Sequence, residues 1–297
     1  MDNLKLVKSF EKETICGYDV SEKMKKIWNV ELNILHVFQK ICKDNGLTYY
    51  AIGGTLLGAI RHKGYIPWDN DIDVGMPRND YMRFLEIAPD SIKYPLFVQS
   101  YRSERSFTYD MVKIRDCRTS GFTENDKINK GNKGIFFDIF PLDNIPDDKE
   151  LEQKENRKHG FQFHLISFTS RKGSYHGKTG IILNLIRGMM IRIICQRLKQ
   201  YFFDRMIADS SKYNSTKTAY CGLRLFWRAD KYRWRNEDVA EMIDVPFEGT
   251  SIAVPKGYDR ILTDVYGDYN KFVIGGSNHE GVFLDPDVPF EELLKGR

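Results

Sequence analysis

The sequence predicts an α/β or α+β fold, in which a mixed sheet core carries a helical insertion. Its 297 residues suffice for one large domain or two small ones with a real core. Strand-like and helical patterns alternate up to about residue 146, and the chain is then mainly helical and more basic to about Lys212. We divide the chain accordingly into a sheet core, a helical insertion and a C-terminal part that completes the core: 1–146, 147–218 and 219–297.

Residue spacing and composition predict each element. Apolar residues recur at helical spacing over 20–44, and Gly46 supplies a stop. The segment LTYYAI (47–52) predicts a strand that runs into the turn Gly53–Thr55, and LLGAIRHKG can then form a short helix. The later elements are a helix at 78–88, strands at 94–101, 110–116 and 134–143, a hairpin around Glu248-Gly249 and a helix in GYDRILTDVYGDYNKF.

Composition excludes several classes of protein. Hydrophobic residues make up 41% of the chain and charged residues 29%, as in a globular protein rather than a disordered one. The net charge of +4 comes from 45 basic and 41 acidic residues, which is too mild to indicate a nucleic-acid partner. The five cysteines are dispersed and never form CxxC, which favours a reducing compartment and no structural zinc. There is no signal-peptide pattern and no run of about 18 apolar residues, so we expect a cytoplasmic protein.

The stretch IPWDNDIDVGM (66–76) places aspartates at alternate positions: Asp69, Asp71 and Asp73. In an extended strand these carboxylates project to one face, and the apolar residues near them project to the other. Like charges this close repel one another unless they are protonated, solvated or neutralised by a cation. Two interpretations stay open here, a solvated acidic turn and a site for a divalent metal ion.

A metal site needs further groups, and the chain offers them. Asp138 is an isolated charge in the apolar strand GIFFDIFPLD; it could be a third metal ligand, cap a helix or pair with an arginine. The turn Gly53–Thr55 offers backbone N–H groups to an anion, although a glycine pair by itself more often makes a simple turn. Together, these groups favour phosphoryl transfer from a nucleotide substrate.

The motifs carry a family resemblance. The run GGTLLGAIRHKGYIPWDNDIDVGMPRNDYMRF, followed by GIFFDIFPLD, resembles the LicD family of phosphotransferases, and VPKGYDRILTDVYGDY resembles its C-terminal segment. The resemblance covers residues 47–143 and 250–270. It implies a nucleotidyltransferase-like mixed sheet core, with an acceptor cleft completed by the C-terminal part. One departure is Asn70, where the family usually has an aspartate.

The resemblance also implies an activity. Such proteins move phosphocholine or a similar phospho-alcohol group from a CDP-linked donor to a sugar of a cell-surface glycan (lipopolysaccharide, teichoic acid or capsule) and release CMP. It implies CDP-choline as donor, a glycan acceptor that can be lipid-linked, and Mg²⁺, or Mn²⁺ in its place, as cofactor. Two alternatives stay open: a true nucleotidyltransferase that adds NMP to a small molecule or protein, and a non-catalytic glycan- or nucleotide-binding protein of the same fold.

Carried over to this chain, the resemblance assigns Asp71 and Asp73 to metal binding. Asp138 either completes the metal site or acts as general base on the acceptor hydroxyl. Asp69 precedes this pair and could instead orient Arg61 or a neighbouring histidine. The donor phosphates are assigned to the residues of the turn: Gly53, Gly54 and Thr55.

Other residues have two interpretations each. Arg61 could meet a pyrophosphate or end a helix in solvent. Lys113 and Arg115 share a strand face and predict a phosphate clamp, with a salt bridge to one of the aspartates as the alternative. By resemblance, Tyr266 shapes the acceptor side. His279 could be a catalytic or ligand residue, or a solvated loop histidine.

The stretch IILNLIRGMMIRIICQRLKQYFF (181–203) is strongly apolar and contains four basic residues: Arg187, Arg192, Arg197 and Lys199. This pattern is typical of a basic helix at a membrane interface, where lipid-linked acceptors are found. One hypothesis is therefore peripheral contact with the inner face of the cell membrane. The alternative is a core helix of the insertion with snorkelling arginines.

Overall fold

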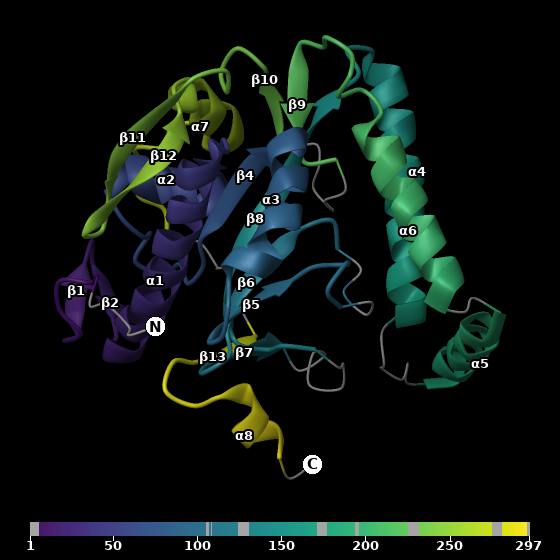
Figure 1. Ribbon diagram of the computed structural model, residues 1–297, viewed down its shortest axis with the longest axis horizontal. Coiled ribbons are helices and arrows are strands. Elements are labelled where there is room, and N and C mark those ends of the chain that lie inside the picture. Colours follow the sequence, from purple (N-terminus) through teal and green to yellow (C-terminus); the bar gives the residue numbers. More distant parts are fainter. Residues whose placement is uncertain are drawn as a thin grey trace.

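A seven-stranded mixed sheet forms the centre of the computed structural model (Figure 1). Its central strand, β8 (Ile135–Ile145), pairs in parallel with β4 (Asp73–Pro77) and antiparallel with β6 (Val112–Asp116). The sheet continues outward through β3 (Tyr50–Ala51), β5 (Leu96–Gln99), β9 (Tyr220–Gly222) and β10 (Arg233–Arg235). The structure describes residues 6–104, 107, 109–123, 131–170, 177–193, 196–224, 232–274 and 281–295, so His279 lies outside the described residues.

Helix α1 (Glu22–Asn45) packs its apolar stripe against one face of this sheet. Ser21 caps its start by accepting a hydrogen bond from the backbone N–H of Met24, and Gly46 ends it in the left-handed region at φ 59°. The predicted helix over 20–44 is therefore confirmed.

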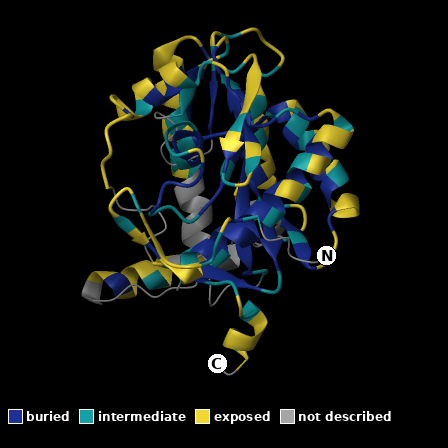
Figure 2. Cartoon of the chain, turned by 90° about the vertical axis from the view of Figure 1, so that its left-hand side faces the viewer, coloured by how far each residue is buried: buried dark blue, intermediate teal, exposed yellow. Residues whose placement is uncertain are grey.

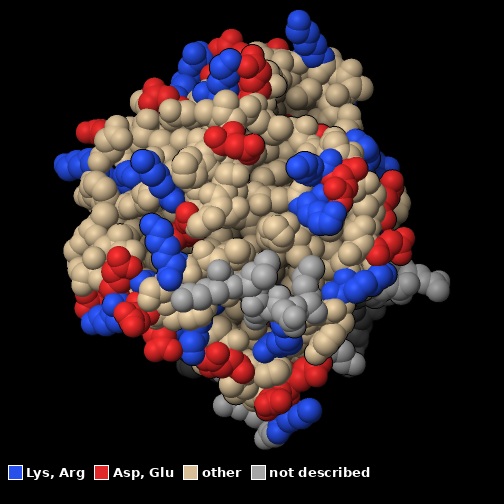
Figure 3. All heavy atoms as spheres, turned by 60° about the vertical axis from the view of Figure 1, so that its left-hand side comes forward, with Lys and Arg blue, Asp and Glu red and all other residues tan. Residues whose placement is uncertain are grey.

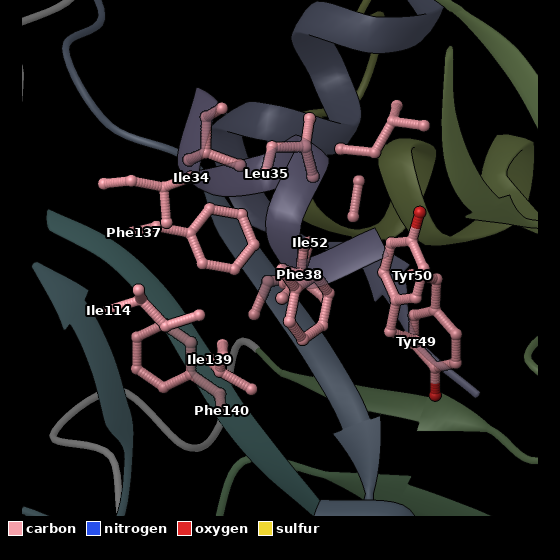
Figure 4. Packing of buried hydrophobic residues seen from close by; sticks show 14 of the residues in the cluster. Ile34, Leu35, Phe38, Tyr49, Tyr50, Ile52, Ile114, Phe137, Ile139 and Phe140 are labelled. Atoms are coloured by element: carbon pink, nitrogen blue, oxygen red, sulfur yellow. The ribbon is translucent and has the colours of Figure 1, made fainter. Parts of the chain in front are cut away.

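Phe38 of α1 is the centre of the core. Its ring centroid lies 5.0 Å from that of Phe137 on β8 and 5.3 Å from that of Phe84 on α3 (Arg78–Ser91). Figure 4 shows Phe38 facing Phe137 and Ile139. Successive residues of a strand point to opposite faces, so Asp138, which lies between these two residues, points to the face away from α1.

Shorter elements surround the central sheet. Three pairs of strands form separate two-stranded sheets: β1 (Glu13–Ile15) with β2 (Tyr18–Val20), β7 (Ser120–Thr123) with β13 (Val282–Asp285), and β11 (Met242–Phe247) with β12 (Thr250–Pro255). The third pair confirms the predicted hairpin around Glu248-Gly249. The remaining helices outside the insertion are α2 (Gly53–Arg61), α7 (Tyr258–Tyr266) and α8 (Phe290–Leu294).

Helices α4 (Lys149–Ser170), α5 (Gly177–Ile193) and α6 (Gln196–Ser211) follow β8, in the region where the sequence pattern is helical. In Figure 1, α4 and α6 lie side by side at the right, and α5 lies beyond their lower ends. The expectation of one continuous helix over 181–203 is wrong, because the chain turns back so that α6 packs along α4. The division of the chain into three units stays a prediction.

Burial and charge follow this architecture. Figure 2 shows buried residues concentrated at the central sheet and exposed residues on the outer faces of the helices. In the face drawn in Figure 3, basic and acidic side chains are interspersed, in keeping with the similar numbers of basic residues (45) and acidic residues (41) in the chain. Of the helices in the described part of the chain, none is long and apolar enough to cross a membrane.

Arg78, at the start of α3, joins three segments through buried ion pairs. Its Nε donates to Asp143 Oδ1 of β8 at 2.8 Å, and its Nη1 donates to Asp110 Oδ1 at 3.0 Å. Side chains of all three residues are at most 6% exposed. Asp143 also accepts a hydrogen bond from Asn214, at 2.6 Å, so the network reaches the segment that follows α6.

Replacing Arg78 with methionine should lower the free energy of unfolding by about 3–5 kcal/mol, because two buried carboxylates lose their partner. Urea denaturation at neutral pH measures this change. The matched control is Arg83→Met on the same helix, where the partner Asp80 is 3.4 Å away and the arginine side chain is 53% exposed. This control should change the free energy by less than about 1 kcal/mol; equal losses in the two variants would contradict the assignment.

Candidate active site

Three charged side chains form a row across three strands of the central sheet. Asp73 of β4 is the register partner of Asp138 of β8, and Asp138 is the register partner of Lys113 of β6. Directly opposed residues share a face, so all three project from the face opposite α1. The Lys113 ammonium donates to both oxygens of Asp138, at 2.7 and 2.6 Å.

The two other aspartates of the motif lie just before β4. The predicted acidic strand begins only at Asp73, since Asp69 and Asp71 belong to the irregular segment that leads into it. Burial, the charge of Asp71 and a hydrogen bond between the two carboxyl groups raise the pKa of Asp69 well above its usual range. Asp69 therefore joins the carboxylate cluster. Arg61, which it was expected to orient, donates instead to His62 and to the backbone carbonyls of Tyr269 and Lys271.

The cluster carries more negative charge than the nearby protein side chains neutralise. Burial and the charges of Asp71, Asp138 and Asp69 raise the pKa of Asp73 well above its usual range, and Lys113 acts in the opposite direction. Asp73 Oδ1 is buried and has no hydrogen-bond partner among the described residues. Such a set of oxygens can hold protons or a hard cation.

The fit to a metal ion is incomplete in this arrangement. Within the described ranges, no group of three or more His, Cys, Asp or Glu side chains is already placed to hold a metal ion. The unpaired oxygen of Asp73 and the adjacent Asp71 fit an oxygen-ligated ion, whereas both oxygens of Asp138 accept from Lys113. The metal therefore stays a proposal, with Asp71 and Asp73 as its first ligands.

The glycine turn packs directly against the carboxylates. A Cβ on Gly54 would lie 2.5 Å from Asp69 Oδ2, and Gly53, at φ 55°, lies beside Asp73 and the Tyr232 hydroxyl. The N-cap residue of α2, Ile52, makes no side-chain cap, so the first backbone N–H groups of this helix are candidates to bind an anion. The Thr55 hydroxyl accepts a hydrogen bond from the backbone N–H of Asp73 at 2.8 Å, which holds the first residue of β4 in place.

Three residues that the sequence did not single out support the acidic segment: Trp28 and Glu31 of α1, and Tyr65, which follows α2. The Trp28 indole N–H donates to the backbone carbonyl of Asp69 at 2.9 Å, and its ring stacks on Tyr65 at 4.7 Å between centroids. The Tyr65 hydroxyl donates to the buried carboxyl group of Glu31 at 2.9 Å. Burial and the charge of Asp71 raise the pKa of Glu31 well above its usual range. The signal available in the sequence was a glutamate on the apolar stripe of a helix.

Tyr266, at the end of α7, reaches the same cluster from the C-terminal part. Burial and the charges of Asp69 and Asp73 raise its pKa to about 12, and 43% of the residue is still exposed. It is therefore a neutral phenol at physiological pH and a hydrogen-bond donor at the edge of the site. Its location is compatible with the acceptor side implied by the resemblance.

Two arginines that were predicted to bind phosphate, Arg61 and Arg115, donate hydrogen bonds to other groups of the protein. Arg61, partly buried at the end of α2, donates from Nη1 to the backbone carbonyls of Tyr269 and Lys271, and its contact with a pyrophosphate stays a prediction. The Arg115 guanidinium is buried and donates to Gln99 Oε1 and to two backbone carbonyls. For Lys113, the alternative of a salt bridge to an aspartate is confirmed.

A mixed sheet, a pair of aspartates on adjacent strands and a glycine turn beside them are features of a phosphotransferase. Residues 46–168 match the family model described as "LicD/FKTN/FKRP, nucleotidyltransferase domain". The chain is 33% identical over 256 residues, 81% of its length and 88% of the relative's, to the lipopolysaccharide cholinephosphotransferase LicD of Haemophilus influenzae. This protein therefore belongs to the LicD family, as its motifs predicted.

Two uncharacterized proteins of Rickettsia are similar over shorter regions. One, from Rickettsia prowazekii, is 31% identical over 125 residues, which is 41% of this chain and 43% of that protein. The other, from Rickettsia typhi, is 47% identical over 50 residues, 17% of this chain and 16% of that protein.

Replacing Asp73 with asparagine should lower turnover about 1,000-fold or more while the free energy of unfolding stays equal or rises. Asparagine keeps the shape but removes a buried charge that the fold compensates poorly. Turnover is measured with saturating donor, and stability by urea denaturation in EDTA. Asp90→Asn, at a side chain that is 97% exposed, is the control and should change neither. Near-normal turnover in Asp73→Asn would remove this carboxylate from the chemistry.

Trp28→Phe should lower kcat about tenfold and reduce the free energy of unfolding by about 1 kcal/mol, because the Asp69 carbonyl loses its donor. Trp234→Phe is a matched control, since the Trp234 indole N–H is buried without a partner among the described residues. The control makes the same ring change but removes no hydrogen bond. If both variants lost turnover equally, the hydrogen bond to Asp69 would have no specific role.

Proposed function

We propose that this protein transfers a phospho-alcohol group, phosphocholine in the first instance, from a CDP-linked donor to a sugar hydroxyl of a cell-surface glycan, with release of CMP. The observation that carries the proposal is the 33% identity across 88% of the Haemophilus lipopolysaccharide cholinephosphotransferase. The aspartates Asp73 and Asp138 beside the N-terminus of α2 support it, because phosphoryl transfer needs both charge neutralisation and hydrogen-bond donors to phosphate. The proposal places the protein in the cytoplasm, where nucleotide-linked donors are made.

A divalent cation, Mg²⁺ or Mn²⁺, is part of the proposal. Asp73 and Asp71 would hold it, with Asp138 as a further ligand when Lys113 releases one of its oxygens. When bound, such an ion supplies charge neutralisation to the transferred phosphoryl group. The unpaired Oδ1 of Asp73 is the feature of this chain that favours it.

The chain's own residues would position the donor and handle the proton. Backbone N–H groups of Gly53 and Gly54 would bind donor phosphate oxygens at the start of α2. The acceptor hydroxyl attacks phosphorus, the bond to the CMP oxygen breaks, and the hydroxyl proton passes to a base. As the alternative to its role as a metal ligand, Asp138 is the candidate base, and for either role its ion pair with Lys113 must open. The neutral Tyr266 phenol can donate a hydrogen bond to a sugar or phosphate oxygen.

A nucleotidyltransferase activity is the second candidate, because the matched family description names a nucleotidyltransferase domain. The two activities differ in the bond that is broken. Phospho-alcohol transfer cleaves the pyrophosphate of a CDP-alcohol and releases CMP, whereas nucleotidyl transfer cleaves an NTP and releases pyrophosphate.

Incubation with CDP-choline, CDP-ribitol, CDP-glycerol and CDP-ethanolamine should release CMP from one donor in preference to the others. The release should require Mg²⁺ or Mn²⁺ and stop in EDTA, because the carboxylate cluster then lacks a counter-charge. A lipopolysaccharide or teichoic acid acceptor should accelerate it. Chromatography of CMP is the measurement, and a mock preparation from cells that do not make this protein is the control for contaminating hydrolases.

Three results would contradict parts of the proposal. Pyrophosphate release from an NTP, with no CMP from any CDP-alcohol, would support the nucleotidyltransferase. Undiminished CMP release in EDTA would remove the metal from the mechanism. Equal CMP release by the mock preparation would show that another enzyme makes the product.

A further inference from the structure

The helix α5 (Gly177–Ile193) exposes an apolar face that the described part of the chain does not cover. Five of its side chains are between 41% and 70% exposed: Ile181, Ile182, Leu185, Ile186 and Met189. Their spacing of i, i+1, i+4, i+5 and i+8 places them on one face of the helix. A contiguous apolar face of this kind marks an interaction surface, since isolated exposed apolar residues are ordinary but clustered ones are not.

The position of α5 leaves this face accessible. Figure 1 shows α5 beyond the ends of α4 and α6, away from the central sheet. In Figure 2, most of the residues of α5 with a described burial are exposed. The apolar side chains of α5 whose burial is described are exposed rather than packed into the protein, which disfavours the core-helix interpretation for this part of 181–203.

The charge of the same segment selects the partner. The stretch 177–203 contains no Asp or Glu and five basic residues: Lys178, Arg187, Arg192, Arg197 and Lys199. An apolar face with basic residues close in sequence is complementary to an anionic lipid surface, where apolar side chains enter the interface and cations meet head-group phosphates. A second copy of the chain would instead bring two such basic segments together, which like-charge repulsion disfavours.

We infer that α5 docks this protein on anionic membrane surfaces, with Ile182, Leu185 and Met189 inserted below the lipid head groups. The helix lies in the plane of the interface, because it is too short and too interrupted by charge to span a bilayer. The inference is independent of the reaction, so failure of the proposed activity would leave it in place.

Flotation of the purified full chain with lipid vesicles tests the inference without donor or acceptor. The chain should bind vesicles of phosphatidylcholine and phosphatidylglycerol at low salt, and bind less to phosphatidylcholine alone or at high salt. Leu185→Glu should weaken binding about tenfold or more, and Met189→Glu similarly. Both positions are at least 60% exposed, so neither substitution should impair folding, which circular dichroism checks.

The matched control is Leu293→Glu, which makes the same change on an exposed helix elsewhere, α8, where the leucine is 41% exposed. This variant should bind vesicles as the unmodified chain does. Equal binding by Leu185→Glu, or no binding by the unmodified chain, would overturn the inference. A dimer in lipid-free solution that Leu185→Glu dissociates, together with no vesicle binding, would assign the face to a second copy.

Discussion

The repulsion among closely spaced carboxylates, two of them buried and two partly buried, is the constraint on which the arrangement of the site depends. Asp69, Asp71, Asp73 and Asp138 are held together in a poorly solvated place, and the pKa values of Asp69 and Asp73 are raised in consequence. An unsupported chain would separate such charges. The parallel register of β4 and β8, the missing Cβ of Gly54 and the Trp28 hydrogen bond to the Asp69 carbonyl together prevent this.

Much of the fold could be predicted because its main elements are long and periodic. The apolar stripe of α1, the hairpin of β11 and β12 and the apolar strand β8 each have a strong local signal. The strands β9, β10, β7 and β13 could not be specified from the sequence, because each has only three or four residues and forms by pairing with another strand. The division of 181–203 between two helices was also missed, because it depends on the packing of α6 along α4.

The aspartates of the candidate site could be predicted from the sequence, but most of the hydrogen-bond partners of the nearby arginine and lysine side chains could not. An aspartate in an apolar strand, such as Asp138, is conspicuous, and three aspartates at alternate positions stand out although only Asp73 lies in a strand. The direction of an arginine side chain depends instead on which carbonyl groups the fold brings near it. Arg61 and Arg115 therefore find backbone acceptors, and Lys113 finds Asp138.

The excess of carboxylates has a consequence for the order of binding. A pyrophosphate-bearing donor is an anion, and an acidic cluster with Lys113 as its nearby cation would repel it. Under the proposed function, the donor and the divalent cation must therefore bind in a mutually dependent way, since each reduces the electrostatic cost of the other. The N–H groups at the start of α2 would add affinity for phosphate without adding a side-chain charge. Two neutral hydroxyl groups lie at the edge of the site, that of Tyr266 near the carboxylates and that of Tyr232 beside Gly53.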